Sequence, residues 1–380
     1  MKIVLAIDSF KGSLSTLEAG HAAARGILRA LPDAETLVCP LADGGEGTVE
    51  AILSALNGER VEIPVTGPLG DPVLATYGYI GERGLAVMEM SSAAGITLVS
   101  RERLDPLKAT TFGVGEMIAH ALSQGCREIL MGIGGSATND GGAGMLQALG
   151  FSLLDERGEE IPRGAAGLER LSEIRADGVH PALAACRFRI ACDVTNPLCG
   201  PTGCSAVFGP QKGATALTVP RMDAALRRFA ALTRRILPAA DENKAGAGAA
   251  GGLGFALASY LGATLEKGAP LVCEAVGLEE RIATADLVLT GEGRLDSQSA
   301  MGKAPAGVAA IAKKYGLPVL GFSGCVTEDA GVLNSHGIDA FFPILRTPCT
   351  VEEAMEKDTA ARNLEATVEQ AMRLWLCAKA

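Results

Sequence analysis

The sequence predicts an α/β protein of two domains: a Rossmann-like parallel-sheet domain formed from both ends of the chain, and a mixed α/β domain inserted between them. Three observations lead to this prediction. Apolar runs alternate with helical patterns at both ends of the chain, as in a parallel sheet covered by helices. The middle breaks that rhythm with short strands and Gly-Pro turns. A chain of 380 residues is also long enough for two domains.

The N-terminal segment predicts a βαβ unit. KIVLAID (2–8) is a short apolar run closed by an acidic residue, which is typical of the first strand of a parallel sheet. Ser15 and Glu18 form a capping box at the start of a helix. The apolar face of that helix is predicted to include a packed His21 together with Leu14, Leu17, Ala24, Leu28 and Leu31. TLVCPLAD (36–43) predicts the second strand.

The alternation returns in the last hundred residues. Strands are predicted at 286–293, 318–324 and 340–345, with a helix at 304–315 and an amphipathic helix at the C-terminus. We therefore expect residues 1–63 and 280–380 to form the Rossmann-like domain and residues 64–279 the inserted domain. The active site is expected in the cleft between the domains, because ligands of open α/β sheets bind beyond the carboxyl ends of the strands.

The middle of the chain contains its most informative motif. Residues 61–98 predict an antiparallel meander, and REILM (127–131) predicts a buried strand. This strand leads into GIGGSATNDGGAG (132–144), called the glycine loop below, and then into a helix that ends at Gly150. Such a loop presents unpaired N–H groups and lets the backbone approach an anion, so it suits phosphate or carboxylate. Asn139 and Asp140 add polar groups for a metal or a hydroxyl.

Composition excludes several classes of protein. A net charge of −10 and an aromatic content of 4% argue against nucleic acid or an anionic membrane as partner. Residues 246–265 carry no charge, but their Gly- and Ala-rich first half predicts a loop and a packed helix, not a membrane span. The N-terminus does not resemble a signal peptide, and the ten cysteines contain no C-x-x-C pair, which indicates reduced thiols in the cytoplasm. Nothing in the sequence determines the oligomeric state.

The glycine loop alone does not identify the ligand. Gly132, Gly134 and Ala137 also fit the dinucleotide fingerprint, and Asp155 closes an apolar run about 20 residues later. One alternative is therefore an NAD-dependent oxidoreductase, although that fingerprint normally follows the first strand of a domain. Another alternative is a non-catalytic sensor of a sugar acid and a nucleotide. The many carboxylates argue against a sensor, because they contribute nothing to the binding of anions.

Charged residues flanked by glycines follow several other apolar runs, and together they suit phosphoryl transfer. This reaction needs Mg²⁺ on carboxylates and phosphate oxygens, cations at the phosphates, and a carboxylate that orients the attacking hydroxyl. Arg294 suits a bidentate grip on a substrate carboxylate. The carboxylate candidates are Asp43, Glu46, Asp193, Glu292 and Asp296, and the lysines that could face phosphates are Lys11, Lys212 and Lys303.

Seven motifs, in order, resemble the type I glycerate kinase family over essentially the whole chain. They are DSFKGSLS, PLADGGEGT, GIGGSATNDGGAG, CDVTNPLCGPTG, FGPQKGA, GAGAAGGLGF and TGEGRLDSQSAMGK. The resemblance implies a kinase that uses ATP and Mg²⁺ to phosphorylate D-glycerate, with 2-phosphoglycerate as the usual product. It also implies two domains, one of them inserted.

On this resemblance, roles can be assigned to individual residues. We expect ATP phosphates at Gly134, Gly135, Ser136 and Asn139, with help from Lys303, and Mg²⁺ at Asp193 and Asp43. Glycerate is expected at Ser9, Lys11, Asp43 and Arg294. The expected catalytic residues are Asp296, Asp193, Lys11, Arg294 and Glu292. Asp296 would orient the glycerate hydroxyl, although the roles of Asp193 and Asp296 could be exchanged.

Overall fold

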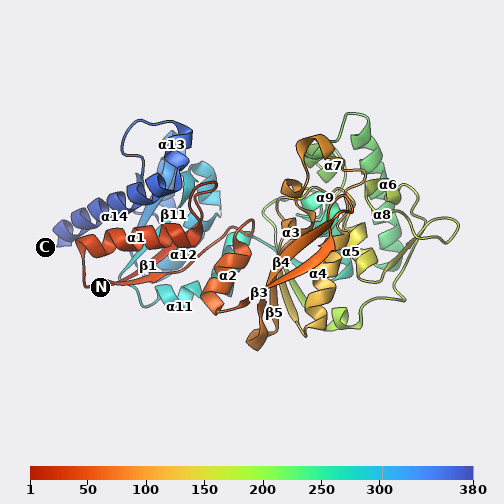
Figure 1. Cartoon of the computed structure of the whole chain (residues 1–380), viewed down its shortest axis with the longest axis horizontal. Helices are drawn as coiled ribbons and strands as arrows, with labels where there is room; N and C mark the ends of the chain where they lie inside the picture. Colours follow the sequence, from red (N-terminus) through yellow and green to blue (C-terminus); the bar gives the residue numbers. More distant parts are fainter. Residues whose placement is uncertain (302, 380) are drawn as a thin grey trace. The chain divides into compact units, whose positions relative to one another are not determined.

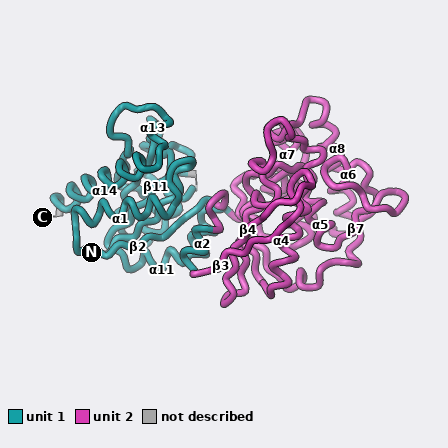
Figure 2. The backbone as a smooth tube through the Cα atoms, in the orientation of Figure 1, with its two compact units in different colours: residues 1–43, 50–56, 267–380 teal, residues 44–49, 57–266 magenta. Residues whose placement is uncertain are grey.

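The computed structural model describes residues 1–301 and 303–379 and divides into two compact units (Figure 2). Unit 1 comprises Met1–Asp43, Glu50–Leu56 and Lys267–Ala380, and unit 2 comprises Gly44–Val49 and Asn57–Glu266. The predicted boundaries, after residues 63 and 279, lie several residues further along the chain than these. Both units combine helices with a sheet, which confirms the predicted α/β class.

Unit 1 is built on a five-stranded sheet with the order β13-β12-β11-β1-β2, in which every pairing is parallel. Its strands are β1 (Lys2–Ile7), β2 (Glu35–Val38), β11 (Leu287–Leu295), β12 (Val319–Val326) and β13 (Ala340–Pro343). All five were predicted from apolar runs. β2 is shorter than predicted and ends before Pro40, which has no N–H group for the ladder. The carboxyl ends of the five strands therefore lie at one edge of the sheet.

Helices α1 and α14 lie side by side in unit 1 (Figure 1) and share a buried core with Ile3, Leu5 and Ile7 of β1. The predicted capping box is present, because Ser15 Oγ accepts from the Glu18 N–H and the Glu18 carboxylate accepts from the Ser15 N–H. The helices that lie wholly in this unit are α1 (Thr16–Ala30), α10 (Gly268–Ala275), α11 (Leu278–Ile282), α12 (Ala304–Lys314), α13 (Val351–Met355) and α14 (Lys357–Lys379).

The buried face of α1 differs from the predicted one. His21 is exposed, so the prediction that it packs in the core is wrong. The face that packs is made of small residues instead. A Cβ atom at Gly20 would meet the Val38 side chain of β2, and one at Gly26 would meet the Glu365 carbonyl of α14. Because close backbone approach determines this face, the spacing of the larger apolar residues does not identify it.

Unit 2 is built on a six-stranded sheet with the order β10-β9-β6-β5-β4-β3. The pairs β3–β4 and β4–β5 are antiparallel, as predicted for residues 61–98, and the remaining pairs are parallel. Its strands are β3 (Glu59–Thr66), β4 (Pro72–Ile80), β5 (Leu85–Glu89), β6 (Glu128–Gly132), β9 (Arg187–Ala191) and β10 (Thr264–Glu266). A separate hairpin joins β7 (Ser152–Leu154) to β8 (Glu173–Arg175).

The helices of unit 2 include those predicted at 112–124, after the glycine loop and within 246–265. They are α3 (Ser91–Ala94), α4 (Phe112–Ser123), α5 (Ala143–Ala148), α6 (Ala165–Leu168), α7 (Cys204–Phe208), α8 (Thr218–Ile236) and α9 (Ala249–Tyr260). α2 (Thr48–Leu56) begins in unit 2 and continues in unit 1. Across the described residues, no helix combines the length and the apolar character needed to span a membrane.

Candidate active site

The first group of site residues lies at the carboxyl ends of β1 and β11 in unit 1. Ile7 pairs with Gly291, and the Asp8 N–H donates to the Gly291 carbonyl at 2.9 Å. This register places Asp8, directly after β1, beside Glu292 of β11. The parallel sheet thus brings together two acidic residues that are far apart in the sequence.

Asp8 is the carboxyl group of this site whose pKa is shifted most. It is only 4% exposed, and its Oδ1 accepts from the Ser9 N–H at 2.7 Å. Burial, reinforced by the negative charges of Asp43 and Glu292, raises the pKa of Asp8 to about 7. Asp8 can therefore hold or release a proton near neutral pH. We did not predict it as a site residue, although its position at the close of the first strand was the available signal.

Two lysines accompany these carboxylates. Lys11 Nζ donates to Asp43 Oδ2 at 2.9 Å, and Lys303 Nζ lies 3.9 Å from Glu292 Oε2. Lys303 is also the residue that precedes the first turn of α12. Burial raises the pKa of Glu292, and the charge of Lys303 opposes that shift. Unit 1 thus brings together five charged residues: Asp8 and Lys11 after β1, Asp43 after β2, and Glu292 and Lys303 in and after β11.

Arg294 and Asp296 lie further along the same segment, at the end of β11 and directly after it. The Arg294 side chain is 65% exposed, and its Nε lies 3.4 Å from Asp296 Oδ2. Asp296 Oδ1 accepts from the N–H groups of Gln298 and Ser299, at 3.0 and 3.1 Å, in the turn that follows β11. Arg294 is therefore accessible to a ligand, whereas one oxygen of Asp296 is committed to the local turn.

The second group lies in unit 2, where β6 and β9 end beside one another. Gly132 pairs with Ala191, so the glycine loop and Asp193 leave neighbouring parallel strands at the same edge of the sheet. Gly134, Gly135 and Asp193 are exposed. Within the described part of the chain, the N–H groups of Gly134 and Gly135 donate to no protein acceptor. Free N–H donors beside an exposed carboxylate suit a phosphate group with a bound Mg²⁺ ion.

Two other glycine motifs pack against the glycine loop. A Cβ atom at Gly132 would collide with the carbonyl of Gly44, in the segment that follows Asp43. A Cβ atom at Gly251 would collide with the carbonyl of Thr138, and the Gly251 carbonyl accepts from the Gly141 N–H at 2.9 Å. The glycine clusters of the sequence therefore allow backbone segments to approach one another closely.

The second half of the glycine loop is buried, which corrects the roles expected for Asn139 and Asp140. Asn139 has no exposed surface, and its Nδ2 donates to Ser205 Oγ at 2.8 Å. Asp140 is equally buried and accepts four hydrogen bonds from Thr111, Gly142 and Gly144. Burial raises the pKa of Asp140, while these hydrogen bonds oppose the shift. Both side chains are therefore buried, with hydrogen bonds inside unit 2.

Lys212 is also placed differently from the prediction that it faces phosphates. It is only 2% exposed, and its Nζ donates to Ser136 Oγ and to the Thr138 carbonyl, each at 2.6 Å. Burial lowers the pKa of Lys212 to about 8. The lysine thus bonds to the buried part of the glycine loop instead of reaching solvent.

Glu89 is a second buried carboxyl group that we did not predict. It ends β5, and its carboxylate accepts from the Val49 N–H at 3.0 Å and from the N–H groups of Gly47 and Thr48. Burial raises the pKa of Glu89, and these hydrogen bonds oppose the shift. It therefore anchors the first turn of α2. The only signal in the sequence was a single acid within the apolar run VMEM.

Asp155 does not have the position that the oxidoreductase alternative requires. A dinucleotide-binding site needs an acidic residue at the end of a strand parallel to β6. β7 instead pairs antiparallel with β8, outside the six-stranded sheet. Asp155 Oδ2 lies 2.5 Å from Arg170, and its Oδ1 accepts from the N–H groups of Arg157 and Glu159. It closes a hairpin and is not placed to bind a ribose, so this alternative is wrong.

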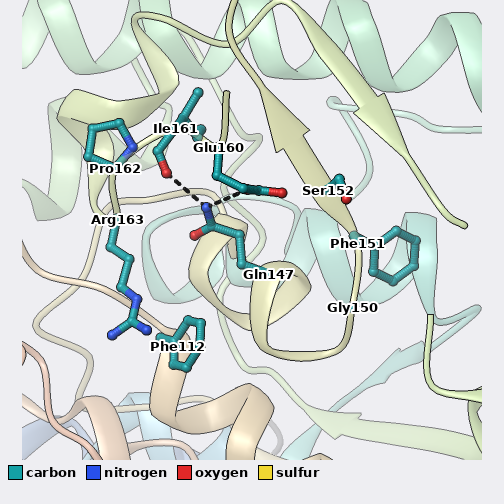
Figure 3. A pocket seen from close by; sticks show the side chains of 9 residues that line it. All are labelled: Phe112, Gln147, Gly150, Phe151, Ser152, Glu160, Ile161, Pro162 and Arg163. Carbon is teal, nitrogen blue, oxygen red and sulfur yellow. Dashed lines mark hydrogen bonds between the residues drawn. The ribbon is translucent and has the colours of Figure 1, made fainter. Parts of the chain in front are cut away.

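A cavity of about 580 Å³ lies near the C-terminal end of α5 (Figure 3). The Arg163 guanidinium lies 3.4 Å from the centroid of the Phe112 ring, and Gln147 Nε2 donates to Glu160 and to the Ile161 carbonyl. None of the predicted site residues lines this cavity. Its lining comprises Phe112, Gln147, Gly150, Phe151, Ser152, Glu160, Ile161, Pro162 and Arg163.

The predicted Mg²⁺ ligands form no preassembled cage. In residues 1–301 and 303–379, no group of three or more His, Cys, Asp or Glu side chains is placed to hold a metal ion. Mg²⁺ in phosphoryl-transfer enzymes usually takes one or two carboxylates, and substrate phosphates and water complete its shell. Asp193 beside the glycine loop meets that requirement. Asp43 is instead paired with Lys11.

A glycine loop with free N–H groups and a cluster of lysines and carboxylates, both at the carboxyl ends of parallel strands, are typical of small-molecule kinases. Residues 3–376 match the model of the glycerate kinase family, and the chain belongs to that family. The resemblance predicted from the seven motifs is thereby confirmed, as is the prediction of a kinase.

Individual relatives match over almost their full lengths. The chain is 48% identical to glycerate 2-kinase of Escherichia coli K12, with 98% of this chain and 99% of the relative covered. It is 47% identical to a glycerate kinase of Bacillus subtilis 168, with 99% and 100% covered. A crystal structure provisionally assigned as glycerate kinase 2 from Salmonella typhimurium LT2 superposes with a TM-score of 0.91 at 49% identity, and covers 100% of this chain and 99% of that one.

Proposed function

We propose that this enzyme transfers the γ-phosphoryl group of ATP to D-glycerate in the presence of Mg²⁺ and yields 2-phosphoglycerate and ADP. The observation that carries the proposal is the cluster of Asp8, Lys11, Asp43, Glu292 and Arg294 at one edge of the unit 1 sheet. It offers cations for a carboxylate and carboxyls for a hydroxyl, which are the two functional groups of glycerate. The names of the full-length relatives support the same substrate.

Glycerate is assigned to unit 1. Arg294, with its exposed planar guanidinium, binds the substrate carboxylate through two parallel hydrogen bonds. Lys11 adds a second positive charge, and its ion pair with Asp43 holds the ammonium near the end of β1. Ser9, directly after Asp8, supplies a neutral hydroxyl donor. Together these groups select a hydroxy acid over a neutral polyol.

Two carboxyl groups are candidates for orienting the substrate hydroxyl. Asp296 is the residue expected from the family motif, and it retains Oδ2 beside Arg294. Asp8 is the second candidate, because its pKa of about 7 matches that of a group that accepts a proton near neutral pH. We favour Asp8, since Asp296 Oδ1 already accepts two backbone N–H groups.

The ATP phosphates are assigned to unit 2. The N–H groups of Gly134 and Gly135 and the hydroxyl of Ser136 would bind phosphate oxygens, and Asp193 would hold Mg²⁺ beside them. When bound, Mg²⁺ neutralises charge on the phosphates. Lys303 is assigned to the transferred phosphoryl group, since the buried Lys212 cannot reach it. We further propose a cytoplasmic location, because the exposed Cys325, Cys349 and Cys377 are unpaired thiols.

The experiment that tests this proposal is ADP release by the purified protein with ATP, Mg²⁺ and either D-glycerate or glycerol. We expect Mg²⁺-dependent turnover with D-glycerate and far slower turnover with glycerol, which lacks the carboxylate. Equal rates with the two substrates would show that the cationic residues do not recognise a carboxylate. No turnover with either would contradict the proposed substrate.

A further inference from the structure

Lys212 is a buried ammonium group that bonds to neutral acceptors and forms no direct ion pair with any described residue. It lies at the end of the turn Pro210–Lys212 in the motif FGPQKGA, and its two recorded acceptors, the Ser136 hydroxyl and the Thr138 carbonyl, are neutral. Among the residues that the structure describes, no carboxylate lies within ion-pair distance of its ammonium group. Burying an ammonium group without a partner of opposite charge is costly, so such groups are rare outside functional sites.

Two titratable groups near Lys212 act on its ammonium group through their charges, without a hydrogen bond or an ion pair to it. Asp140 and Cys204 are the two whose charges act on it. The charge of Asp140 favours the charged form of Lys212, but its carboxylate accepts from Thr111, Gly142 and Gly144 and makes no hydrogen bond to Lys212, so it balances the ammonium group only in part. Burial raises the pKa of the Cys204 thiol to about 11, so it is uncharged near neutral pH.

Ser136 connects the buried ammonium to the exposed part of the glycine loop. Its oxygen accepts from Lys212 Nζ at 2.6 Å, which leaves the hydroxyl proton available for another acceptor. Ser136 directly follows Gly134 and Gly135, the exposed residues with unpartnered N–H groups. The loop therefore offers three successive donors, the last of them polarised by the buried charge.

We infer that Lys212 is a positioning residue for phosphate binding: its buried ammonium, acting through Ser136 and Thr138, supplies the counter-charge for a polyphosphate bound on Gly134 and Gly135. Lys212 does not touch the ligand. The inference rests on the proposed function, in which this loop binds the phosphates of ATP. It also explains why a lysine is buried where a neutral side chain would cost less to bury.

The inference has a measurable consequence in proton linkage. The free ammonium has a pKa of about 8, so it is partly neutral at about pH 8.5. An anion bound above it favours the charged form and raises that pKa. Binding at this pH must then be coupled to the uptake of a proton by the protein.

The test is isothermal titration of the full chain with inorganic tripolyphosphate at about pH 8.5, in two buffers of different ionisation enthalpy. Tripolyphosphate itself titrates near this pH, so the quantity compared is the difference in proton exchange between proteins: the wild type should take up a fraction of a proton more than Lys212→Met. Lys212→Met should weaken binding about 10- to 100-fold, the loss expected when one nearby positive charge is removed at an effective dielectric constant of about 20, and should remove the Lys212 contribution to the uptake. Lys108→Met is the matched control, because Lys108 is a 79% exposed lysine of the same unit and its loss should change neither quantity.

A second variant keeps the test decisive if Lys212→Met does not fold. Ser136→Ala retains the buried ammonium but removes the hydroxyl, so it should weaken tripolyphosphate binding and retain the proton uptake. The inference is overturned if tripolyphosphate does not bind the wild type, or if Lys212→Met binds it with unchanged affinity and uptake. It is also overturned if Lys212→Met weakens only D-glycerate binding. Because no turnover is needed, an absence of ADP formation by the wild type would refute the proposed function alone.

Discussion

Lys11 Nζ lies 2.9 Å from Asp43 Oδ2, and this ion pair joins the segment after β1 to the segment after β2. The Lys11 side chain is largely exposed, so the pair contributes little to stability. Its consequence is positional, because it fixes an ammonium group near Asp8 and Glu292, whose charges act on Lys11 as well. A hydroxy-acid substrate requires this arrangement, in which a cation binds the carboxylate of the substrate and a carboxyl group binds its hydroxyl.

Arg294→Lys should weaken glycerate binding by about 1.5–3 kcal/mol, because lysine cannot form the second parallel hydrogen bond of a guanidinium. ATP affinity should change little. Titration of each ligand separately measures both effects. If the variant loses ATP affinity and keeps glycerate affinity, Arg294 belongs to the nucleotide and the assignment is reversed.

Asp8→Asn and Asp296→Asn should differ in their kinetics. If Asp8 accepts the hydroxyl proton, Asp8→Asn lowers kcat by about 10²–10⁴ with glycerate binding nearly intact. Wild-type kcat should then rise as the pH increases through about 7. Asp296→Asn should have a smaller effect, through its turn and Arg294. Steady-state kinetics of the wild type and both variants from about pH 5 to 9 distinguish the two carboxyl groups. If Asp296→Asn lowers kcat more than Asp8→Asn does, Asp296 is the group that accepts the hydroxyl proton.

Asp8 should also make stability depend on pH. Its folded-state pKa of about 7 lies above the ordinary value of 3.8 for an aspartate, so the folded protein binds more protons than the unfolded chain between these values. Asp8 therefore lowers the free energy of unfolding as the pH rises through this window, by up to about 4 kcal/mol at pH 8. Asp8→Asn should flatten this dependence in denaturant titrations. If the free energy of unfolding depends on pH in the same way in the wild type and in Asp8→Asn, the burial of this carboxyl group is contradicted.

Gly26→Ala should destabilise unit 1 by about 1–3 kcal/mol, because the added Cβ would meet the Glu365 carbonyl where α1 packs on α14. Gly307→Ala in α12 is the matched control. Among the described residues, no atom outside its own stretch of helix lies within 4 Å of its Cβ position, so the change should stabilise the helix by about 0.4–1 kcal/mol. Thermal unfolding of the two variants would show opposite shifts. Equal shifts would mean that the α1–α14 contact is not close.

The parallel strands of unit 1 and the meander of unit 2 were predictable because their signals are local. Apolar runs such as KIVLAI and LVLTGEG end at glycines or charges, and the pairing of β1 with β11 then places those ends together. The buried face of α1 was not predictable in the same way. It depends on contacts of Gly20 with β2 and of Gly26 with α14, which are distant in the sequence.

The segments of the candidate site were predictable from the sequence, whereas the burial and contacts of individual side chains within them were not. Charge type and glycine context identified the segments of Lys11, Arg294 and the glycine loop. They could not show which polar groups are buried, since burial depends on packing from other segments. Asn139 is covered near Ser205, and Lys212 is covered beneath Ser136. Asp8 was missed for the converse reason, because its high pKa arises from burial, reinforced by the charges of Asp43 and Glu292, and only the fold creates these surroundings.

The most direct test of the central claim is phosphorus NMR of the products formed from ATP and D-glycerate in the presence of Mg²⁺. The proposed function predicts ADP and a single phosphomonoester on the 2-hydroxyl, identified by its coupling to one carbon-bound proton at C2. A phosphomonoester coupled to two protons would place the phosphoryl group on the 3-hydroxyl and contradict the proposed product. The absence of any phosphorylated glycerate would contradict the proposed function itself.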